Sequence, residues 1–220
     1  QYESYQNFTM PDLYHVVNGI ELFSPKFNVV PPGVNENIYF PYTQQEDRIP
    51  NRAEQVEDLL FYKEDESQVF GKLNNPKKRP LFSMARLDRI KNLTGLVECF
   101  GRSPQLQEHC NLILVAGKLH THETTDSEEK EEIEKMYRLI EEYNLHGKIR
   151  WLGVRLPKSD SGEVYRVIAD HEGVFVQPAL FEAFGLTILE AMISGLPTFG
   201  TQFGGPLEII QDQVNGFYIN

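Results

Sequence analysis

From about residue 80 onward, apolar residues follow two alternating patterns along the chain. Short, nearly continuous apolar runs occupy residues 80–86, 111–116, 148–154, 173–179, 196–200 and 216–219, as expected of buried parallel strands. Between them, apolar residues recur at helical spacing over 92–100, 127–143, 162–169, 186–194 and 206–211. This alternation predicts an α/β fold with a doubly wound parallel sheet, whose ligands bind beyond the carboxyl ends of the strands.

The first third of the chain has a different pattern. Residues 14–17 and 28–30 are strand-like, residues 31–33 read Pro-Pro-Gly and predict a turn, and one short helix is expected over 54–62.

One motif at a strand end has the features of a nucleotide-sugar site. Glu182 follows the run 173–179, Gly185 opens the next helix, and Glu190 lies about one turn inside that helix. Free N–H groups and a positive dipole at a helix start suit a diphosphate. Two separated carboxylates would suit the hydroxyls of a sugar and of a ribose; alternatively, both glutamates are solvated on a helix that merely packs.

A second strand end carries cations. Arg86 ends the run 80–86 and Lys91 stands near the start of the next helix, so both are expected at one rim of the sheet. A planar guanidinium and a point charge together suit two phosphates. The alternative is a group of loop cations without a ligand, and Arg89 is expected to be solvated or salt-bridged.

Two further groups of residues carry weaker signals. The glycine pair at 204–205 precedes a helix and either lets backbone approach a ligand or forms a tight turn. His120, His122 and Glu123 match no common zinc spacing, so no metal site is expected. The sequence has no Ser-His-Asp arrangement, P-loop or GxGxxG motif, which argues against a nicotinamide enzyme.

Composition narrows the function further. The 220 residues are 40% hydrophobic and 24% charged, which is ordinary for a soluble globular protein. The formal charge of −11 makes nucleic acid an unexpected partner, since a binder would need a basic surface. Cys99 and Cys110 fit no metal or redox motif, which favours a reducing, cytoplasmic location. A start at Gln1 suggests a fragment or a processed chain.

Taken together, several motifs resemble sucrose synthase. They are MARLDRIKN, EAFGLTILE, LPTFGTQFGGPLEII, NVVPPGVNENIYFP, the initial QYES and the central GEVYR, and they run over almost the whole chain. Members of that family are retaining glycosyltransferases with the two-Rossmann GT-B fold. The resemblance implies that residues 1–30 are the end of the N-terminal GT-B domain or an interdomain segment. Residues 31–220 would form the C-terminal Rossmann-like domain, incomplete at its C-terminus.

The resemblance also implies roles at the phosphates. Arg86 and Lys91 would neutralise the nucleoside diphosphate leaving group, and the backbone amides of Leu186 and Thr187 would bind its phosphates. No metal is implied, because these groups can stabilise the growing charge.

Similar roles are implied at the sugars and the base. Glu190 would hold the ribose hydroxyls, and Glu182, with the amides of Phe184 and Gly185, would hold hydroxyls of the glucosyl unit. Plant members place a Gln and an Asn against the base, where this chain has Arg155 and Ser161. The nucleotide is therefore expected to be UDP or ADP.

The implied reaction is sucrose plus NDP giving NDP-glucose and fructose, reversibly. The alternatives are a sucrose-phosphate synthase or another retaining GT-B transferase, or a nucleotide-binding module without turnover. The missing N-terminal domain would supply the acceptor pocket, a glycine loop and a catalytic histidine. We expect the full-length protein to be a homo-oligomer and the isolated chain to be inactive.

Overall fold

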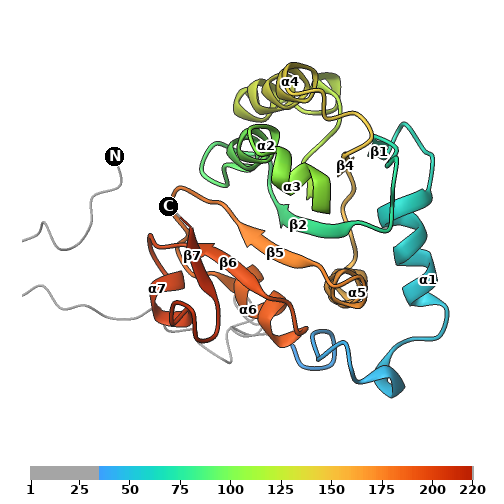
Figure 1. Ribbon diagram of the computed structural model, residues 1–220, viewed down its shortest axis with the longest axis vertical. Helices are drawn as coiled ribbons and strands as arrows, with labels where there is room; N and C mark the ends of the chain where they lie inside the picture. Colours follow the sequence, from blue (N-terminus) through green and yellow to red (C-terminus); the bar gives the residue numbers. More distant parts are fainter. Residues whose placement is uncertain (1–34, 220) are drawn as a thin grey trace, which may run out of the picture. The chain divides into compact units, whose positions relative to one another are not determined.

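A computed structural model describes residues 35–219. Among these residues, seven strands form one sheet in the order β1-β4-β3-β2-β5-β6-β7 (Figure 1). The strands are β1 (Val69–Phe70), β2 (Arg79–Ala85), β3 (Cys110–Ala116), β4 (Ile149–Leu152), β5 (Val174–Gln177), β6 (Thr198–Thr201) and β7 (Phe217–Ile219). All neighbouring pairs are parallel except β1 and β4.

The order of β2 to β7 is that of a Rossmann fold, in which the chain starts at the centre and winds outward in both directions. The predicted α/β, doubly wound parallel sheet is therefore confirmed. The winding direction reverses after β4, when the chain returns to the centre of the sheet. Strand β5 then pairs with β2 on the side opposite to β3. A crevice beyond the carboxyl ends of β2 and β5 is the expected place for a ligand.

Helices cover both faces of the sheet. They are α1 (Arg52–Glu57), α2 (Leu93–Gly101), α3 (Pro104–His109), α4 (Ser127–Glu142), α5 (Lys158–Asp170), α6 (Leu186–Ile193) and α7 (Pro206–Ile209). The described residues also form the shorter helical turns η2 (Gln45–Asp47), η3 (Asp58–Tyr62) and η4 (Thr121–Glu123). Figure 1 shows α2, α3 and α4 together on one side of the sheet, and α5 and α6 on the other.

Strand alternation explains how both faces become buried. Leu81 of β2 joins the hydrophobic core formed with α2 and α4. The next residue, Phe82, points to the opposite face, where its ring lies 5.8 Å from that of Tyr165 in α5. Because both faces are covered, six of the seven residues in β3 are buried, which produces the continuous apolar run in the sequence.

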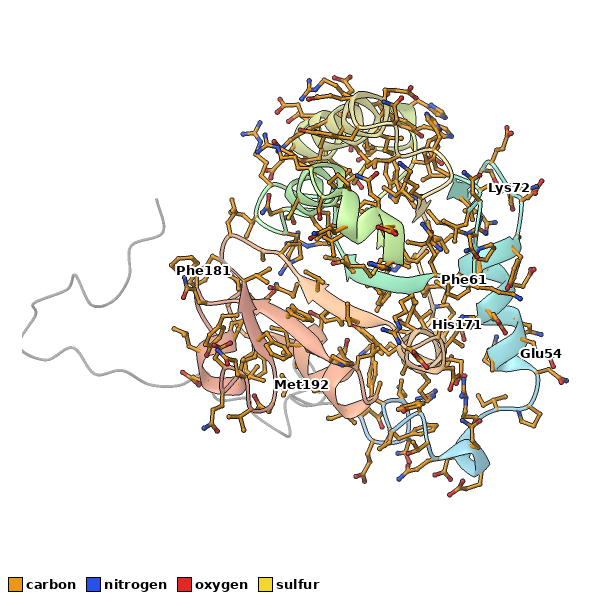
Figure 2. The ribbon with its side chains drawn as sticks, in the orientation of Figure 1. Glu54, Phe61, Lys72, His171, Phe181 and Met192 are labelled. Atoms are coloured by element: carbon orange, nitrogen blue, oxygen red, sulfur yellow. The ribbon has the colours of Figure 1, made fainter. Side chains whose placement is uncertain are left out.

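Several boundaries differ from the expectation. Helix α5 begins at Lys158 rather than at residue 162, so Ser161 lies inside its first turn. The helix expected over 54–62 is α1 followed by the π-helical turn η3, and Figure 2 shows Phe61 of this turn near His171. Their rings stack with centroids 4.5 Å apart.

Strand β1 and helix α3 of the described part of the chain were not expected. Strand β1 has only two residues, too few for an apolar period to appear. Helix α3 has a signal that identifies it in hindsight: the Ser103 hydroxyl accepts from the amide of Leu106, and Pro104 occupies the first turn. No helix within the described part of the chain is long and apolar enough to cross a membrane.

The domain boundary expected near residue 30 stays a prediction. The chain separates into two compact units, 1–35 and 36–220. The strands expected at 14–17 and 28–30, and the turn at 31–33, lie outside the described residues.

Candidate nucleotide-sugar site

The loops that follow β2 and β5 are joined at the carboxyl edge of the sheet. The amide of Leu180 donates to the carbonyl of Ile90 at 2.8 Å. The side chain of Asn92 donates to the carbonyl of Pro178 at 3.0 Å. These bonds cross the point where the winding direction changes, so the two predicted motifs lie side by side.

Glu182 lies at the centre of this junction. One oxygen, Oε2, accepts from Lys91 Nζ at 2.7 Å and from Gln177 Nε2 at 2.6 Å. The other, Oε1, accepts from the amides of Phe184 and Gly185 at 3.4 and 3.3 Å. The structure thus brings together four of the predicted site residues: Lys91, Glu182, Phe184 and Gly185. The amides of Phe184 and Gly185, which were expected to bind the glucosyl unit together with Glu182, donate to the Glu182 carboxylate itself.

Gln177 is a member of this cluster that sequence reasoning missed. Its amide group is buried at the end of β5, and its donor is directed at Glu182. Its oxygen has no hydrogen-bond partner among the described residues. The only available signal was a polar residue ending an apolar strand.

The start of α6 has the backbone geometry that the glycine predicted. Gly185 is the N-cap, with a φ of 95° that favours glycine. The amides of Leu186 and Thr187 belong to the first turn, where a helix offers no carbonyl partner for them. They remain available for an anion at the positive end of the helix.

Arg86 lies at the same edge but is held differently. Its side chain is 82% exposed and pairs with Asp88 at 3.0 Å. Asp88 also accepts from the backbone amide of Lys91 at 2.8 Å, so one carboxylate links the Arg86 guanidinium to the backbone of Lys91. Arg89 pairs with Glu131 on α4, which confirms it as a salt-bridged neighbour.

A cleft of about 640 Å³ opens beyond the ends of β2, β3 and β4. Arg86, Arg155 and Ser161 all line it, although they come from distant parts of the sequence. Lys118 and Glu129 line it as well and were missed, because nothing in their local sequence separates them from solvated charges.

Glu190 is held apart from Glu182, as the spacing predicted. Its Oε2 accepts from the hydroxyl of Tyr165 at 3.3 Å, and the hydroxyl of Tyr39 faces this carboxylate. Burial raises the pKa of Glu190, while the hydrogen bonds from Tyr39 and Tyr165 lower it in part.

The glycine pair at 204–205 lets the loop after β6 pack closely against the loop after β5. A Cβ on Gly204, which has a φ of 98°, would lie 2.1 Å from the carbonyl oxygen of Glu182. A Cβ on Gly205 would lie 2.3 Å from that of Phe184. Of the two alternatives at this turn, the structure supports the tight turn, because the glycines let it pack against the loop carrying Glu182.

The histidine pair forms a stack. The rings of His120 and His122 are 5.3 Å apart and nearly parallel. Within residues 35–219, no three His, Cys, Asp or Glu side chains are placed to hold a metal ion. Cys99 is exposed and Cys110 half-buried, both as free thiols.

Comparison with known proteins gives the family. Residues 64–220 match the family described as glycosyl transferases group 1. The chain belongs to this family. Residues 1–61 match the first GT-B domain of sucrose synthase.

Curated relatives confirm the resemblance to sucrose synthase. The chain is 76% identical to sucrose synthase of Thermosynechococcus vestitus, over all 220 residues and 27% of the relative's length. It is 52% identical to sucrose synthase 2 of Arabidopsis thaliana, again over the whole chain and 27% of the relative. The chain therefore spans about a quarter of the length of these curated relatives.

Solved structures show the same fold at low identity. Sucrose-phosphate synthase from Thermosynechococcus elongatus aligns with a TM-score of 0.59 and 22% identity, over 85% of this chain and 38% of that one. Anabaena HepE, solved with UDP and glucose, aligns with a TM-score of 0.61 and 19% identity, over 86% and 41%. These neighbours are GT-B glycosyltransferases, so the predicted GT-B fold class is confirmed.

Proposed function

We propose that this chain is the nucleotide-sugar-binding half of a sucrose synthase, which transfers glucose reversibly between sucrose and a nucleoside diphosphate. The observation that carries the proposal is the cluster of Lys91, Glu182 and the start of α6 at the switch point of the sheet. It combines a cation, a carboxylate and free helix amides where a parallel sheet binds its ligand.

The cations and amides would act on the diphosphate. In sucrose cleavage, the bond between the glucosyl anomeric carbon and the fructosyl oxygen breaks, and a terminal phosphate oxygen bonds to that carbon. In the reverse reaction, negative charge grows on the diphosphate as it leaves. Arg86, Lys91 and the amides of Leu186 and Thr187 would stabilise this charge without having to reorganise.

Lys91 and Glu182 must share their contacts with the ligand. The Lys91 ammonium has three donors and uses one on Glu182, so it can reach a phosphate while still holding the carboxylate. Glu182 would then present its remaining acceptor capacity to the glucosyl hydroxyls. Its position is fixed by Gln177 and by the amides of Phe184 and Gly185.

The remaining residues would bind the nucleoside. Glu190 would accept from the ribose hydroxyls, and Arg155 and Ser161, which line the cleft with Arg86, would contact the base. UDP and ADP are the candidate nucleotides. The solved neighbours include HepE with UDP and starch synthase IV of Arabidopsis thaliana with ADP and acarbose (TM-score 0.50, 16% identity, over 85% of this chain and 35% of that one).

The complete reaction needs parts beyond this chain. The acceptor pocket, a glycine loop and a catalytic histidine would come from the N-terminal GT-B domain. A homo-oligomeric full-length protein and a cytoplasmic location belong to the same proposal. A sucrose-phosphate synthase is the second candidate, favoured by the fold similarity to that enzyme and distinguished by a site for an acceptor phosphate.

Calorimetry with UDP and ADP tests the proposal. The wild-type chain should bind, weakly because half a cleft excludes little water, and Arg86→Ala should bind less tightly. Arg89→Ala is the matched control, since Arg89 is also exposed and ion-paired in the same loop. Unchanged affinity in Arg86→Ala, or an equal loss in Arg89→Ala, would contradict the proposed phosphate site.

A further inference from the structure

The segment between residues 36 and 48 packs closely against α5. The carbonyl of Ile38 accepts from Arg166 Nη1 at 2.8 Å, and the Arg166 guanidinium lies 3.8 Å from the centre of the Phe40 ring. A Cβ on Gly162 would lie 2.1 Å from that same Ile38 carbonyl oxygen. Only glycine at this position of α5 lets the segment approach so closely.

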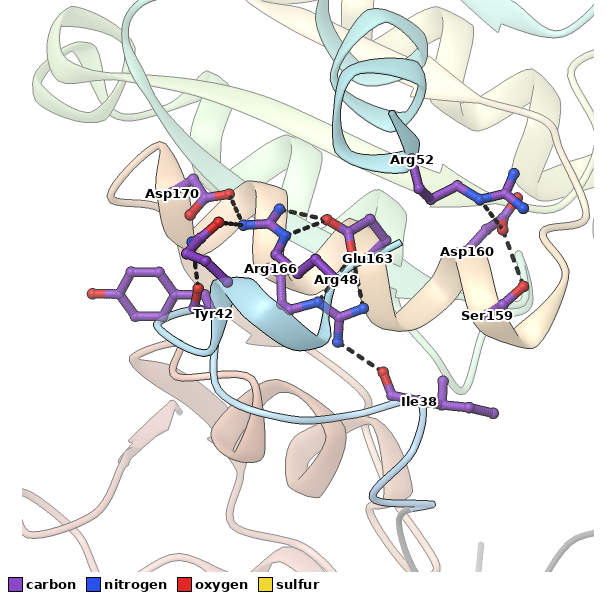
Figure 3. A network of polar contacts seen from close by, with 10 residues as sticks. Ile38, Tyr42, Arg48, Arg52, Ser159, Asp160, Glu163, Arg166 and Asp170 are labelled. Atoms are coloured by element: carbon purple, nitrogen blue, oxygen red, sulfur yellow. Dashed lines mark hydrogen bonds and ion pairs between the residues drawn. The ribbon is translucent and has the colours of Figure 1, made fainter. Parts of the chain in front are cut away.

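A cluster of buried charges fixes the end of this segment. Arg48 bonds Glu163 through Nε at 2.8 Å and Asp170 through Nη1 at 2.7 Å, while Glu163 also accepts from Arg166 (Figure 3). The side chains of Arg48, Glu163 and Arg166 are 7%, 2% and 4% exposed. Breaking one partner would leave a buried charge uncompensated, so the cluster holds the segment in one geometry.

Docking of the segment places Tyr39 against Glu190. Tyr39 is buried and its ring lies 6.1 Å from that of Tyr165, whose hydroxyl donates to the Glu190 carboxylate at 3.3 Å. The Tyr39 hydroxyl faces the same carboxylate, which contributes to raising the pKa of Tyr39. Burial is the main cause that raises the pKa of both phenols, so both remain protonated donors.

The two tyrosines leave Glu190 with capacity for a ligand. A carboxylate has about four acceptor positions; the Tyr165 hydroxyl uses one of them, and the Tyr39 hydroxyl that faces the group would use a second. The remaining positions match the two adjacent hydroxyls of a ribose. Without the tyrosine hydroxyls, the Glu190 carboxylate would be free to rotate and to accept hydrogen bonds from water in place of the ribose hydroxyls.

We propose that Tyr39 and Tyr165 are positioning residues that orient Glu190 for the ribose, and that the docked segment 36–48 delivers Tyr39 to it. This inference rests on the proposed role of Glu190 in nucleotide binding. It makes the affinity for the ribose depend on a segment that lies within the match to the first GT-B domain of sucrose synthase, residues 1–61, and outside the group 1 match, which begins at residue 64.

Calorimetry with ADP and 2′,3′-dideoxy-ADP on the 220-residue chain tests this dependence. Wild type should bind ADP more tightly than the dideoxy compound. Tyr39→Phe and Tyr165→Phe should each reduce this preference by about tenfold, the range of one hydrogen bond to a charged group. Affinity for dideoxy-ADP should not change, because that ligand lacks the two hydroxyls that Glu190 would bind. Tyr62→Phe, an exposed tyrosine on η3, is the control and should keep the full preference.

A pH series adds a readout that loss of packing would not produce. Glu190 is faced by Tyr39 from the docked segment and by Tyr165 and Lys158 from α5. The preference for ADP should disappear as Glu190 becomes protonated. Removing the Tyr39 hydroxyl should move that transition to higher pH, because the hydrogen bond favours the charged carboxylate.

The docking step has its own pair of variants. Arg48→Gln should reduce the preference for ADP over dideoxy-ADP. Arg52→Gln should not, because Arg52 lies on α1, outside the docked segment, and pairs with Asp160 of α5 nearer the surface. If Arg48→Gln fails to fold, Gly162→Ala tests the same docking by steric displacement.

The outcomes separate the two proposals. No binding of ADP or UDP by wild type would overturn the proposed function and this inference with it. Equal binding of ADP and dideoxy-ADP by wild type would overturn the role of Glu190 while leaving the phosphate site. A full ribose preference in Tyr39→Phe and Tyr165→Phe would overturn this inference alone.

Discussion

The carboxyl group of Glu190 is held between two tyrosine hydroxyls in a partly buried position. Burial raises its pKa in the folded protein above the ordinary value of about 4.3. As the pH rises from that value, the unfolded chain releases this proton before the folded one does. The free energy of unfolding therefore falls through this window, and the loss is complete above the folded-state pKa.

Glu190→Gln should remove this loss. We expect the melting temperature of the variant, relative to wild type, to increase as the pH rises from 4 to 7, while its nucleotide affinity falls. Thermal denaturation at several pH values measures the first effect and calorimetry the second. A stability difference that does not change with pH would show that the carboxylate carries no such penalty.

Arg155 and Ser161 decide the expected base selectivity. Arg155 is exposed at the cleft, where it can stack on a purine, and the hydroxyl of Ser161 donates to Pro157 at 3.3 Å. An amide pair would reject the wrong base strongly, because its buried partners would go unpaired. We expect the full-length enzyme to accept ADP at least as well as UDP, measured as kcat/KM. A UDP preference above about a hundredfold, or about 2.7 kcal/mol, would contradict this role.

At the scale of elements, the loop after β6 supports the loop after β5. The amide of Glu182 donates to Phe203 O at 3.0 Å, and Gly205 donates back to Glu182 O at 2.8 Å. Both contacts depend on the glycine turn described above.

Gly204→Ala should displace the loop that carries Glu182. A positive φ and a 2.1 Å contact with backbone cannot be relieved by a side-chain movement. We expect a stability loss of about 1–3 kcal/mol and weaker binding of UDP and ADP. Gly216→Ala is the control, because its φ is not positive and a Cβ there would meet the flexible end of Met192 at 3.0 Å and the Thr198 carbonyl oxygen at 3.1 Å, far milder contacts than 2.1 Å. Equal effects of the two substitutions on nucleotide binding would show that the turn at Gly204 does not support the nucleotide site.

For the whole molecule, charge stabilisation is assigned to cations and helix amides rather than to a metal. Activity of the full-length enzyme should therefore survive chelation by EDTA. Removing Arg86 or Lys91 should lower turnover by about 10²–10³-fold, as for other preorganised donors. Loss of activity with EDTA and its recovery with Mg²⁺ would contradict this assignment.

The isolated 220-residue chain should bind UDP or ADP but should not turn over sucrose. The 220 residues correspond to about 27% of the length of the Thermosynechococcus vestitus relative, and we expect the acceptor side of the cleft to belong to the remainder. Incubating the chain with sucrose and UDP or ADP should release no fructose above background. Sustained release would show that the chain contains a complete site.

The sequence by itself determined the layered architecture. A strand covered on both faces must be apolar at nearly every position, so β3 and its neighbours can be recognised without tertiary information. The positions of Arg86, Lys91 and Glu182 follow as well, because the carboxyl ends of parallel strands share one edge. The resemblance to sucrose synthase was also visible, since its motifs are local.

Only the tertiary structure decided which groups contact one another. Glu182 accepts from Lys91 across 91 positions of the sequence, and Arg48 bonds Glu163 across 115. Such pairs leave no local period, because their members are fixed by strand order and helix packing. The same holds for Tyr39, which reads as an ordinary aromatic until docking on α5 brings its hydroxyl to Glu190. The apolar pattern of a strand reflects its burial and can be read locally. A polar contact between distant residues depends on which elements the fold brings together.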